Sequence, residues 1–493
     1  MLLSLTMCAP LSAHADLSAA DAVPSPDVPP MQVQVSMVKK PVAAGNPISP
    51  EIFCADPTAV EYNGRLFVYG TNDHQQYDES PVKTNNTYEC IKTISMMSTA
   101  DMANWTYHGE IPVGEIAPWI VNSWAPSVIS RKEKDGKTHF YMYFTNSGFG
   151  TGVITATQPL GPWTSPLQKS LVDQQSDFTK KCKVPFDPGA AIGPDGTGYL
   201  AFGGAESRLI KLGADLISVV GEATIPPAPF HFEANELNFI GDTCVYTYNV
   251  DWTDHEPWPY ADCPKPIGCS MVYETSKTPL DEKSWKMRGE YNANPGMFGH
   301  MFCNNHTHLH KFKEKWYLIY HDQELQKSLL PQTGGFRNIN IDVCEVDEAT
   351  VTFKPVKNTR KGVEQVEKLD PRRRVQGETA AATSGMAFTR LPQLGNLAAK
   401  PKEDGAWVAV RGADFGAKAP AKFTFSARGK GKVEVRLDKP DGTLVASGTV
   451  DAGDSFKTFS LKAKAQATGE HAVFVVLAGN MELDWWAFGT PAK

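Results

Sequence analysis

Short apolar strands separated by turns fill most of the chain, and one pattern of them occurs five times. In every copy, a polar or aromatic residue begins a short strand, a tight turn follows, and an aromatic-rich strand comes after the turn. The copies begin at Asp56, Trp124, Asp187, Glu233 and Asn305. Their turns are Asn63-Gly64, Asp135-Gly136, Asp195-Gly196, Gly241-Asp242 and Lys313-Glu314. The pattern predicts one β-hairpin in each copy.

The spacing of the five copies indicates a propeller. They recur at intervals of about 45–70 residues, which is typical of one blade per copy. In a propeller the innermost strands begin at the central channel. Because three of the five starts are acidic, we expect Asp56, Asp187 and Glu233 to meet there.

A second module follows the five copies. We place an all-β, five-bladed propeller at residues 48–360 and a charged linker, poor in aromatic residues, at 361–374. Residues 375–493 read as short alternating strands separated by turns that contain Gly and Asp. The expected strands are 407–410, 421–425, 432–437, 456–461, 471–477 and 483–488. This pattern predicts a β-sandwich of the jelly-roll kind.

The N-terminus indicates export. An apolar run ends in Ala13-His14-Ala15, so we read residues 1–15 as a signal peptide and 16–47, rich in Ala, Pro and Ser, as a flexible leader. No later stretch is long and apolar enough to cross a membrane. The expected location is outside the cell or in the periplasm.

The cysteines fit an exported chain. Without Cys8, eight remain, and an even number permits disulfides in such a protein. Cys263 and Cys269, which flank two prolines, make the best local pair.

Charge and composition narrow the class of partner. The formal net charge is −7, and no basic run exceeds residues 372–374, which argues against nucleic acid as a partner. Aromatic residues make up 10% of the chain, which suits a protein that stacks on sugar rings. Packing in the core accounts for most of them equally well. We expect a monomer.

The three acidic starts suggest glycoside hydrolysis. Two carboxyl groups suffice for that reaction: one protonates the leaving oxygen and the other activates water or attacks carbon. A third can tune the pKa of the acid. Neighbouring Phe53, Phe186, Phe230 and Phe232 would desolvate the carboxyls and keep one of them protonated. One Asp-Pro alone carries little weight, because Asp before Pro is common in turns. Three acidic starts in equivalent positions of a repeat favour a catalytic site.

The ordered set of strand starts resembles glycoside hydrolase family 43. The residues that carry this resemblance are Ala55-Asp56-Pro57, Trp124-Ala125-Pro126, Phe186-Asp187-Pro188, Phe232-Glu233-Ala234 and Asn304-Asn305-His306. The resemblance covers about residues 48–360. It implies a five-bladed propeller that hydrolyses glycosides with inversion.

The resemblance also implies roles for single residues. Asp56 would be the general base, Asp187 would raise the pKa of the acid and hold it, and Glu233 would be the general acid. Arg337 matches an arginine near the substrate. His306 matches a histidine that faces the channel, often beside calcium, so calcium is the expected metal and no organic cofactor is expected.

Two positions depart from the family pattern. Glu236 puts a second carboxyl near Glu233, but it lies one alternation off the same strand face, so Glu233 is kept as the acid. In the family a His followed by Ser is common where this chain has Thr307-His308, which leaves the metal contact open.

Weaker candidates have two interpretations each. Trp124 is a stacking platform or a packed core residue. Asp73 and His74 contact sugar hydroxyls or belong to a solvated loop. The histidines at 300, 306, 308 and 310 bind a metal or are simply hydrogen-bonded.

The C-terminal module resembles family 6 carbohydrate-binding modules. The residues that carry this resemblance are Gln376-Gly377-Glu378, Asp404 to Trp407, Asp414-Phe415-Gly416 and Leu483 to Phe488. Where such modules use Asn before the final Leu-Asp-Trp, this chain has Glu482, and its first loop offers Phe388 as the aromatic residue. Sugar binding and stabilisation of the propeller therefore both stay open.

The sequence predicts a secreted, inverting glycosidase that acts on plant cell-wall pentosans. The expected partner is a polysaccharide or oligosaccharide: arabinoxylan, xylan or arabinan. A propeller followed by a family 6 module most resembles α-L-arabinofuranosidases that debranch arabinoxylan. A β-xylosidase is the first alternative. A non-catalytic carbohydrate-binding propeller is the alternative from another class.

Overall fold

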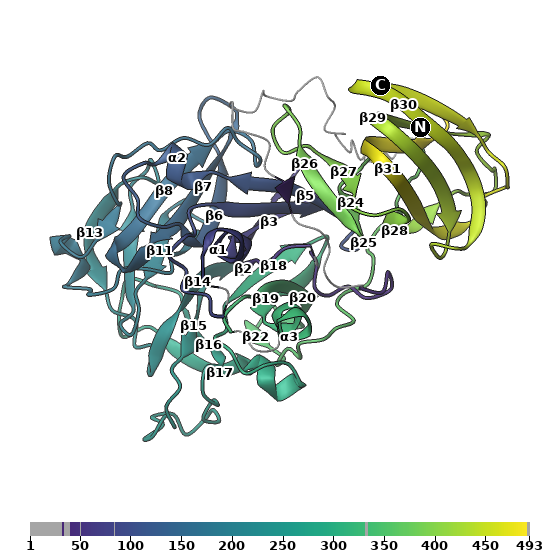
Figure 1. Cartoon of the computed structure of the whole chain (residues 1–493). Helices are drawn as coiled ribbons and strands as arrows, with labels where there is room; N and C mark the ends of the chain where they lie inside the picture. Colours follow the sequence, from purple (N-terminus) through teal and green to yellow (C-terminus); the bar gives the residue numbers. More distant parts are fainter. Residues whose placement is uncertain (1–31, 34–39, 50, 83, 331–333, 491–493) are drawn as a thin grey trace, which may run out of the picture.

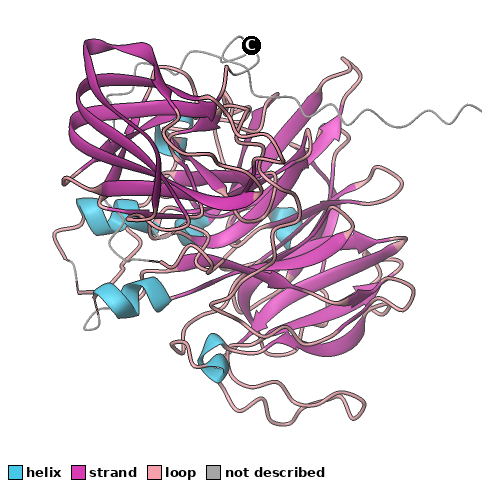
Figure 2. Ribbon diagram, turned by 90° about the vertical axis from the view of Figure 1, so that its right-hand side faces the viewer, coloured by secondary structure: helices cyan, strands magenta, loops and turns pink. Residues whose placement is uncertain are grey.

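The computed structural model describes residues 32–33, 40–49, 51–82, 84–330 and 334–490. It contains a propeller and, beside it, a smaller sheet-rich module formed by the C-terminal part of the chain (Figure 1). Antiparallel strands dominate both parts, and the helices are short (Figure 2). The predicted signal peptide and most of the predicted leader lie outside the described residues.

Five antiparallel sheets form the blades. Each begins with a strand of a predicted hairpin. The blades are β2 (Ala55–Tyr62), β3 (Arg65–Thr71), β4 (Ile94–Thr99) and β5 (Trp105–Ile111); β6 (Trp124–Lys132), β7 (Thr138–Asn146), β8 (Gly150–Ala156) and β9 (Val172–Asp173); β10 (Gly189–Ile192), β11 (Gly198–Phe202), β12 (Arg208–Leu212) and β13 (Val219–Thr224); β14 (His231–Ile240), β15 (Thr243–Val250), β16 (Met271–Ser276) and β17 (Lys286–Asn292); and β18 (Thr307–Phe312), β19 (Lys315–Asp322) and β20 (Asn338–Val343). The predicted fold class is confirmed.

Short elements lie in the connections within and between the blades. They are the helices α1 (Asp73–Glu79), α2 (Val113–Ile116) and α3 (Glu324–Leu329), the 3-10 turns η1 (Ser147–Phe149), η2 (Asp177–Thr179) and η3 (Pro295–Phe298), and the strand pair β21 (Val346–Asp347) and β22 (Thr352–Phe353).

Turn chemistry and aromatic packing explain the hairpins. Asn63 and Gly64 have φ angles of 49° and 73°, and the two-residue turn that matches strand twist requires positive φ at both positions. The aromatic strands after the turns are buried. Tyr69, Tyr143 and Tyr246 on β3, β7 and β15 are fully covered, and they pack within the clusters that join neighbouring blades.

The segment before β2 closes the ring. Ile48 N–H donates to Ile339 O over 2.9 Å, and Cys54 N–H donates to Arg337 O over 2.8 Å, so residues 48–54 lie against the fifth blade. Asn46 is buried and exchanges hydrogen bonds with the backbone of Ile341 in both directions. Residues 40–47, expected in a flexible leader, therefore include a side chain that packs on the propeller, because the backbone of the fifth blade satisfies the Asn46 amide.

The inner strands begin with a left-handed backbone residue. Asp56, Ala125, Asp187 and Ala234 have φ angles between 40° and 62°. At three of these starts the strand register shifts, as in a β-bulge. Such backbone costs about 1 kcal/mol or more at a non-glycine residue and re-aims the adjacent side chains.

The C-terminal module is one antiparallel sheet that folds over on itself. Its strands are β23 (Val375–Gln376), β25 (Ala382–Ser384), β26 (Met386–Arg390), β27 (Leu397–Pro401), β28 (Ala406–Asp414), β29 (Lys422–Leu437), β30 (Thr443–Lys462) and β31 (Glu470–Phe488). The long strands β29 to β31 curve around a core that includes Phe423, Val435 and Trp486 (Figure 1). The short β1 (Gln32–Val33) adds to β26.

The two modules share one hydrophobic core. Trp105 and Tyr107 of the first blade belong to the same buried cluster as Phe388 and Phe425 of the sheet-rich module. The remaining strand, β24 (Thr379–Ala380), pairs with β5 and so extends the first blade. The predicted linker 361–374 packs as well, because Val363 is buried and Leu369 N–H donates to Gly412 O over 3.0 Å.

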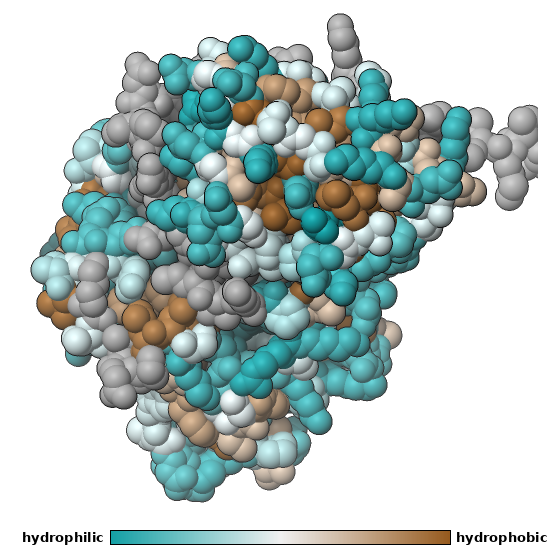
Figure 3. All heavy atoms as spheres, turned by 45° about the vertical axis from the view of Figure 1, so that its right-hand side comes forward, coloured by the Kyte–Doolittle hydropathy of each residue, from teal (hydrophilic) through white to brown (hydrophobic). Residues whose placement is uncertain are grey.

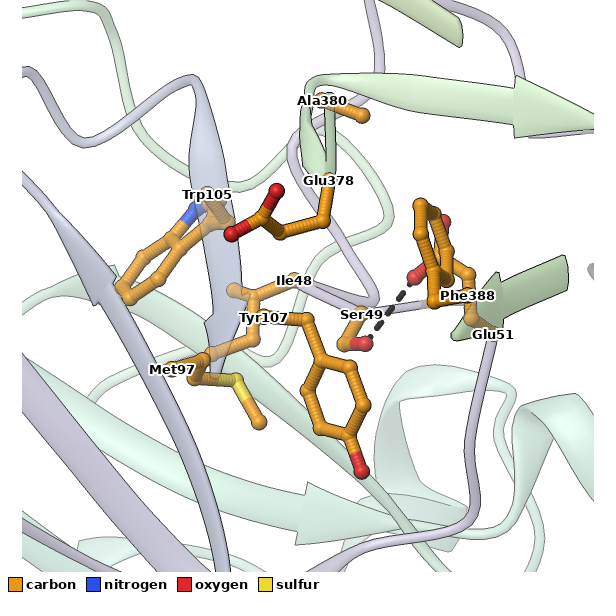
Figure 4. Close-up of a pocket in the computed structure, with 9 residues that line it drawn as sticks. All are labelled: Ile48, Ser49, Glu51, Met97, Trp105, Tyr107, Glu378, Ala380 and Phe388. Atoms are coloured by element: carbon orange, nitrogen blue, oxygen red, sulfur yellow. Dashed lines mark hydrogen bonds between the residues drawn. The ribbon is translucent and has the colours of Figure 1, made fainter. Parts of the chain in front are cut away.

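A small cavity lies at the boundary between the modules. It is lined by Ile48, Ser49, Glu51, Met97, Trp105, Tyr107, Glu378, Ala380 and Phe388 (Figure 4). Ser49 and Thr383 each donate a hydrogen bond to Glu51. Burial raises the pKa values of Glu51 and Glu378. The cavity is a gap in interface packing and contains none of the predicted catalytic residues.

The predicted cysteine pair is not formed. The eight cysteines from Cys54 to Cys344 within the described residues are free. Cys269 is buried and its thiol donates to Asn249 Oδ1 over 3.0 Å, whereas Cys263 packs beside Gly289 of β17. The two side chains therefore face different neighbours.

The face of the molecule shown in Figure 3 is mostly hydrophilic, with apolar residues in patches among the polar ones. In the part of the chain that the structure describes, no helix has the length and hydropathy needed to span a bilayer.

Candidate active site

The strand starts bring the three predicted carboxyl groups together. Asp56 and Asp187 are buried, and His306 lies between them, with Nδ1 3.4 Å from Asp56 Oδ1 and 3.9 Å from Asp187 Oδ2. The backbone N–H of Ala234, next to Glu233, donates to Asp187 Oδ2 over 2.9 Å. One cluster therefore contains the ends of four blades.

Asp56 is surrounded by donors. Arg337 Nη1 donates to its Oδ1 over 2.7 Å, and Thr71 Oγ1 donates to its Oδ2 over 2.6 Å. Burial disfavours the carboxylate, but Arg337 and His306 outweigh burial and hold the pKa of Asp56 well below its usual range. Asp56 is therefore ionised at neutral pH, as a general base must be.

Arg337 is fixed from behind. Its Nε and Nη2 donate to the two carboxylate oxygens of Asp73, each over 2.9 Å, and its guanidinium lies 5.1 Å from the ring centroid of Tyr88. Such a two-point pair fixes the plane of the guanidinium. Asp73 is fully buried, so the prediction that it contacts sugar hydroxyls is wrong: both of its oxygens hold Arg337. His74 packs against Phe53.

Glu233 holds its proton more tightly than Asp56 does. Burial and the nearby charge of Asp187 raise its pKa to about 7. The amide of Asn304 donates from Nδ2 to Glu233 Oε1 over 3.3 Å. Burial also raises the pKa of Asp187. Glu233 thus retains a proton in the range where Asp56 has lost its own.

The four predicted histidines do not share one set of partners. His300 lies 2.7 Å from Asp322, and His308 lies 2.7 Å from Glu236, whereas His306 alone faces the carboxyl cluster. The pairing of Glu236 with His308 turns this second carboxyl away from Glu233, as the strand alternation predicts.

The described residues contain no group of three or more His, Cys, Asp or Glu side chains placed to hold a metal. Calcium takes six to eight oxygen ligands, and His306 offers one nitrogen, with Nδ1 already directed at Asp56. The side chains in place therefore do not make a calcium site by themselves, and channel-bound calcium at His306 stays a prediction.

Trp124 lies at the edge of this cluster. Its indole N–H donates to Tyr88 O over 3.0 Å, and its ring stands 6.1 Å from that of Tyr88. The side chain is half-buried, so packing and sugar stacking are both compatible with its position. Its role in substrate binding stays a prediction.

The sequence analysis missed the residues that support the carboxyls. Thr71 and Thr145 end β3 and β7, and each accepts a backbone hydrogen bond from the start of the next blade, at Ala125 and Asp187. His321, near the end of β19, accepts the Asp56 N–H at Nδ1. A polar residue at the end of each aromatic strand was the signal that could have identified them.

The C-terminal module lacks exposed rings at its predicted sugar-binding positions. Phe388 and Trp486 are buried in its core, and the guanidinium of Arg374 lies 4.4 Å from the ring centroid of Trp485. Glu482, which replaces the expected Asn, forms an ion pair with Arg428 over 2.6 Å. These contacts favour the stabilising role over sugar binding at those positions.

A carboxylate kept ionised and a carboxyl kept protonated in one buried cluster provide the base and the acid of glycoside hydrolysis. The propeller and its site thus define a glycoside hydrolase. The chain belongs to glycosyl hydrolases family 43, whose model matches residues 44–345, and a carbohydrate binding module of family 6 matches residues 376–490. The predicted resemblance is confirmed for both modules.

Particular relatives span nearly the whole chain. An arabinoxylan arabinofuranohydrolase of Bacillus subtilis (strain 168) is 35% identical over 92% of this chain and 93% of its own length. An enzyme of the same name from Paenibacillus polymyxa is 32% identical over 90% of this chain and 74% of its own. A crystal structure of a Bacillus subtilis arabinoxylan arabinofuranohydrolase in complex with cellotetraose superposes with a TM-score of 0.85 at 33% identity, covering 92% of this chain and 99% of that one.

Proposed function

We propose that the protein removes α-L-arabinofuranosyl groups from arabinoxylan with inversion of configuration. The relatives that match almost the full length carry that activity in their names, and they support its transfer to this chain. The observation that carries the proposal is that one cluster keeps Asp56 ionised and Glu233 protonated. A polysaccharide or oligosaccharide is the substrate.

In the proposed reaction, Glu233 gives its proton to the oxygen that leaves with the xylan chain. Water attacks the anomeric carbon from the opposite face as the bond to that oxygen breaks, and Asp56 takes a proton from the water. Asp187 contributes in two ways. Its charge favours protonated Glu233, and its hydrogen bond from Ala234 fixes the backbone that carries the acid.

Product analysis tests this proposal. The protein is incubated with arabinoxylan, and the products are separated by anion-exchange chromatography, with Asp56→Ala as the control. Arabinose as the sole product supports the debranching activity. Xylose or xylo-oligomers as products would mean that the protein cleaves the xylan backbone, as the β-xylosidase alternative predicts. The absence of product from arabinoxylan and arabinan would favour a non-catalytic binding protein.

We also propose that the protein is exported and acts as a monomer. The apolar N-terminal run that ends in Ala13-His14-Ala15 supports export. N-terminal sequencing of the native protein should begin near Asp16, and light scattering should give the mass of one chain. An intact Met1 or a dimer mass would contradict the respective part.

A further inference from the structure

The loop between β15 and β16 stands at the edge of the active site. Glu233 pairs with Asn249 near the end of β15, and the loop begins two residues later. Its neck is closed by hydrogen bonds from Asp251 N–H to Phe230 O and from Cys269 N–H to Asp251 O, each over 2.9 Å. The loop, residues 251–269, projects below β15 and β16 in Figure 1.

This loop carries an exposed aromatic side chain. Trp252 is 52% exposed, although it lies three residues beyond the partner of Glu233. Gly268 packs against the backbone of Trp252, where a Cβ would stand 3.5 Å from its carbonyl oxygen. An indole presented in this way offers an apolar face to a sugar ring. Glu233 protonates the leaving oxygen, so an aromatic ring on the loop that follows its strand partner is placed to meet the chain that leaves.

His255 holds the interior of the loop. It is 1% exposed, and its ring lies 5.0 Å from that of Phe230. Nδ1 stands 2.9 Å from Pro266 O, and Nε2 stands 2.9 Å from Asp251 O. The carboxylate of Asp251 lies 3.2 Å from the same Nε2.

Both neighbours of the His255 ring can only accept. A carbonyl oxygen has no proton to donate, so each ring nitrogen must carry one, and only the imidazolium has two N–H groups. A neutral ring would direct a lone pair at a carbonyl oxygen 2.9 Å away. His321 provides the contrast, because its Nδ1 accepts the Asp56 N–H while Nε2 faces Asn304 O, an arrangement that suits a neutral ring.

We propose that His255, in its doubly protonated form, clasps the 251–269 loop and positions Trp252 against the leaving chain of the substrate. This role rests on the proposed function. The cation connects the start of the loop, at Asp251, to its end, at Pro266. When His255 loses its proton, one of the two connections is lost, and the loop loosens.

The other charged groups near His255 have partners of their own. Lys265 is paired with Asp254 and Glu256, and the β17 carboxylate of Glu290 accepts the Ile267 N–H over 3.3 Å. The ring of Phe230, packed on the other side, carries no charge. Asp251 therefore remains the charged partner of His255, whose ring it faces.

The test compares two substrates. The ratio of kcat/KM for arabinoxylan to kcat/KM for p-nitrophenyl α-L-arabinofuranoside cancels the chemistry of Asp56 and Glu233, which both substrates share. His255→Gln should lower this ratio about fivefold, and Trp252→Ala should lower it similarly.

A matched control separates the clasp from a general loss of charge. His139 also pairs with an aspartate four residues earlier, Asp135, over 2.9 Å, at a distant hairpin turn. His139→Gln should leave the ratio unchanged. A ratio in His255→Gln within about twofold of the unaltered protein, or an equal fall in His139→Gln, would overturn the proposal.

Proteolysis provides a readout that needs no activity. Chymotrypsin cleavage after Tyr260 should be faster in His255→Gln than in the unaltered protein and unchanged in His139→Gln. Equal cleavage rates in His255→Gln and the unaltered protein would overturn the clasp. If neither substrate were hydrolysed, the proposed function would fail, and proteolysis alone would decide on the clasp.

Discussion

At the scale of single residues, the site is governed by how each carboxyl is surrounded. Asp56 touches a guanidinium, a hydroxyl and two imidazoles, whereas Glu233 has burial, one amide and a like-charged neighbour. The sequence predicted that these carboxyls meet, because the repeat placed them at equivalent positions. The sequence could not predict that the carboxylate of Asp73 would bind Arg337, since 264 residues separate the two.

The first prediction concerns Glu233. Activity should fall as the pH rises above about 7, because the acid must hold its proton and its pKa is about 7. Glu233→Gln should lose about 10²–10⁴-fold in kcat on arabinoxylan. Glu236→Gln, which changes the neighbouring carboxyl paired with His308, is the matched control and should retain most activity. Equal losses in both variants would contradict the assignment.

Arg337 sets the acidic side of the pH profile. Asp56 must be ionised, and its carboxylate depends on Arg337, so Arg337→Gln should raise the pKa of Asp56. The acidic limb of kcat/KM should therefore move to higher pH, by about one unit or more. Arg208→Gln, at another buried arginine, on the third blade, should leave the limb in place. If the acidic limb of the kcat/KM profile did not move in Arg337→Gln, a group other than Asp56 would determine that limb.

At the scale of the element, four blades begin with a residue in the left-handed backbone region, and threonine hydrogen bonds support three of these starts, Asp56, Ala125 and Asp187. Hairpins were predictable because turn residues and aromatic alternation are local signals. The left-handed backbone at Asp56 and Asp187 was not, since neither residue requires it. It exists because Thr71 and Thr145, from strands that end at the channel, bond to the starts.

Thr71→Val should weaken both stability and activity. The hydroxyl donates to Asp56 and accepts from Ala125 N–H, so its loss leaves buried groups without partners. We expect about 1–3 kcal/mol less free energy of unfolding. Urea denaturation measures this loss, with Thr243→Val, at the opposite end of a blade, as the control. Similar stabilities for the two variants would argue against the support role.

At the scale of the whole molecule, propeller and sheet-rich module act as one folding unit. The sequence predicted a boundary between them from composition, and residues 44–345 and 376–490 match two different families. It could not show that they share a core, because the contacts between Trp105 and Phe388 depend on docking. A charged segment poor in aromatics looked like a linker, yet Val363 and Leu369 pack it between the modules.

Arg390→Met should destabilise the whole chain through the module boundary. Arg390 Nη2 donates to buried Glu110 Oε2 over 2.8 Å, and without it this carboxyl loses its cationic partner and keeps the hydrogen bond from the Tyr107 hydroxyl. Breaking such a pair costs about 3 kcal/mol. Because burial already raises the pKa of Glu110, its charged form is the costly one, and the loss should grow as the pH rises.

Thermal melting across pH measures the effect of Arg390→Met. Lys277→Met, which removes an exposed ion pair with Asp242, is the matched control and should change little. A single transition that moves to lower temperature is expected in Arg390→Met. Two separate transitions in the unaltered protein would contradict a common folding unit.

The pairing of β24 with β5 has a consequence for engineering. An outer strand with open hydrogen-bonding groups invites other chains to add to it, and residues 379–380 cover part of that edge. A chimera that exchanged the C-terminal module between relatives at residue 375 would replace this cover with a foreign segment. A crossover after Ala381 is safer. Each propeller then keeps its own β24, which covers the edge of β5 and prevents other chains from pairing with it.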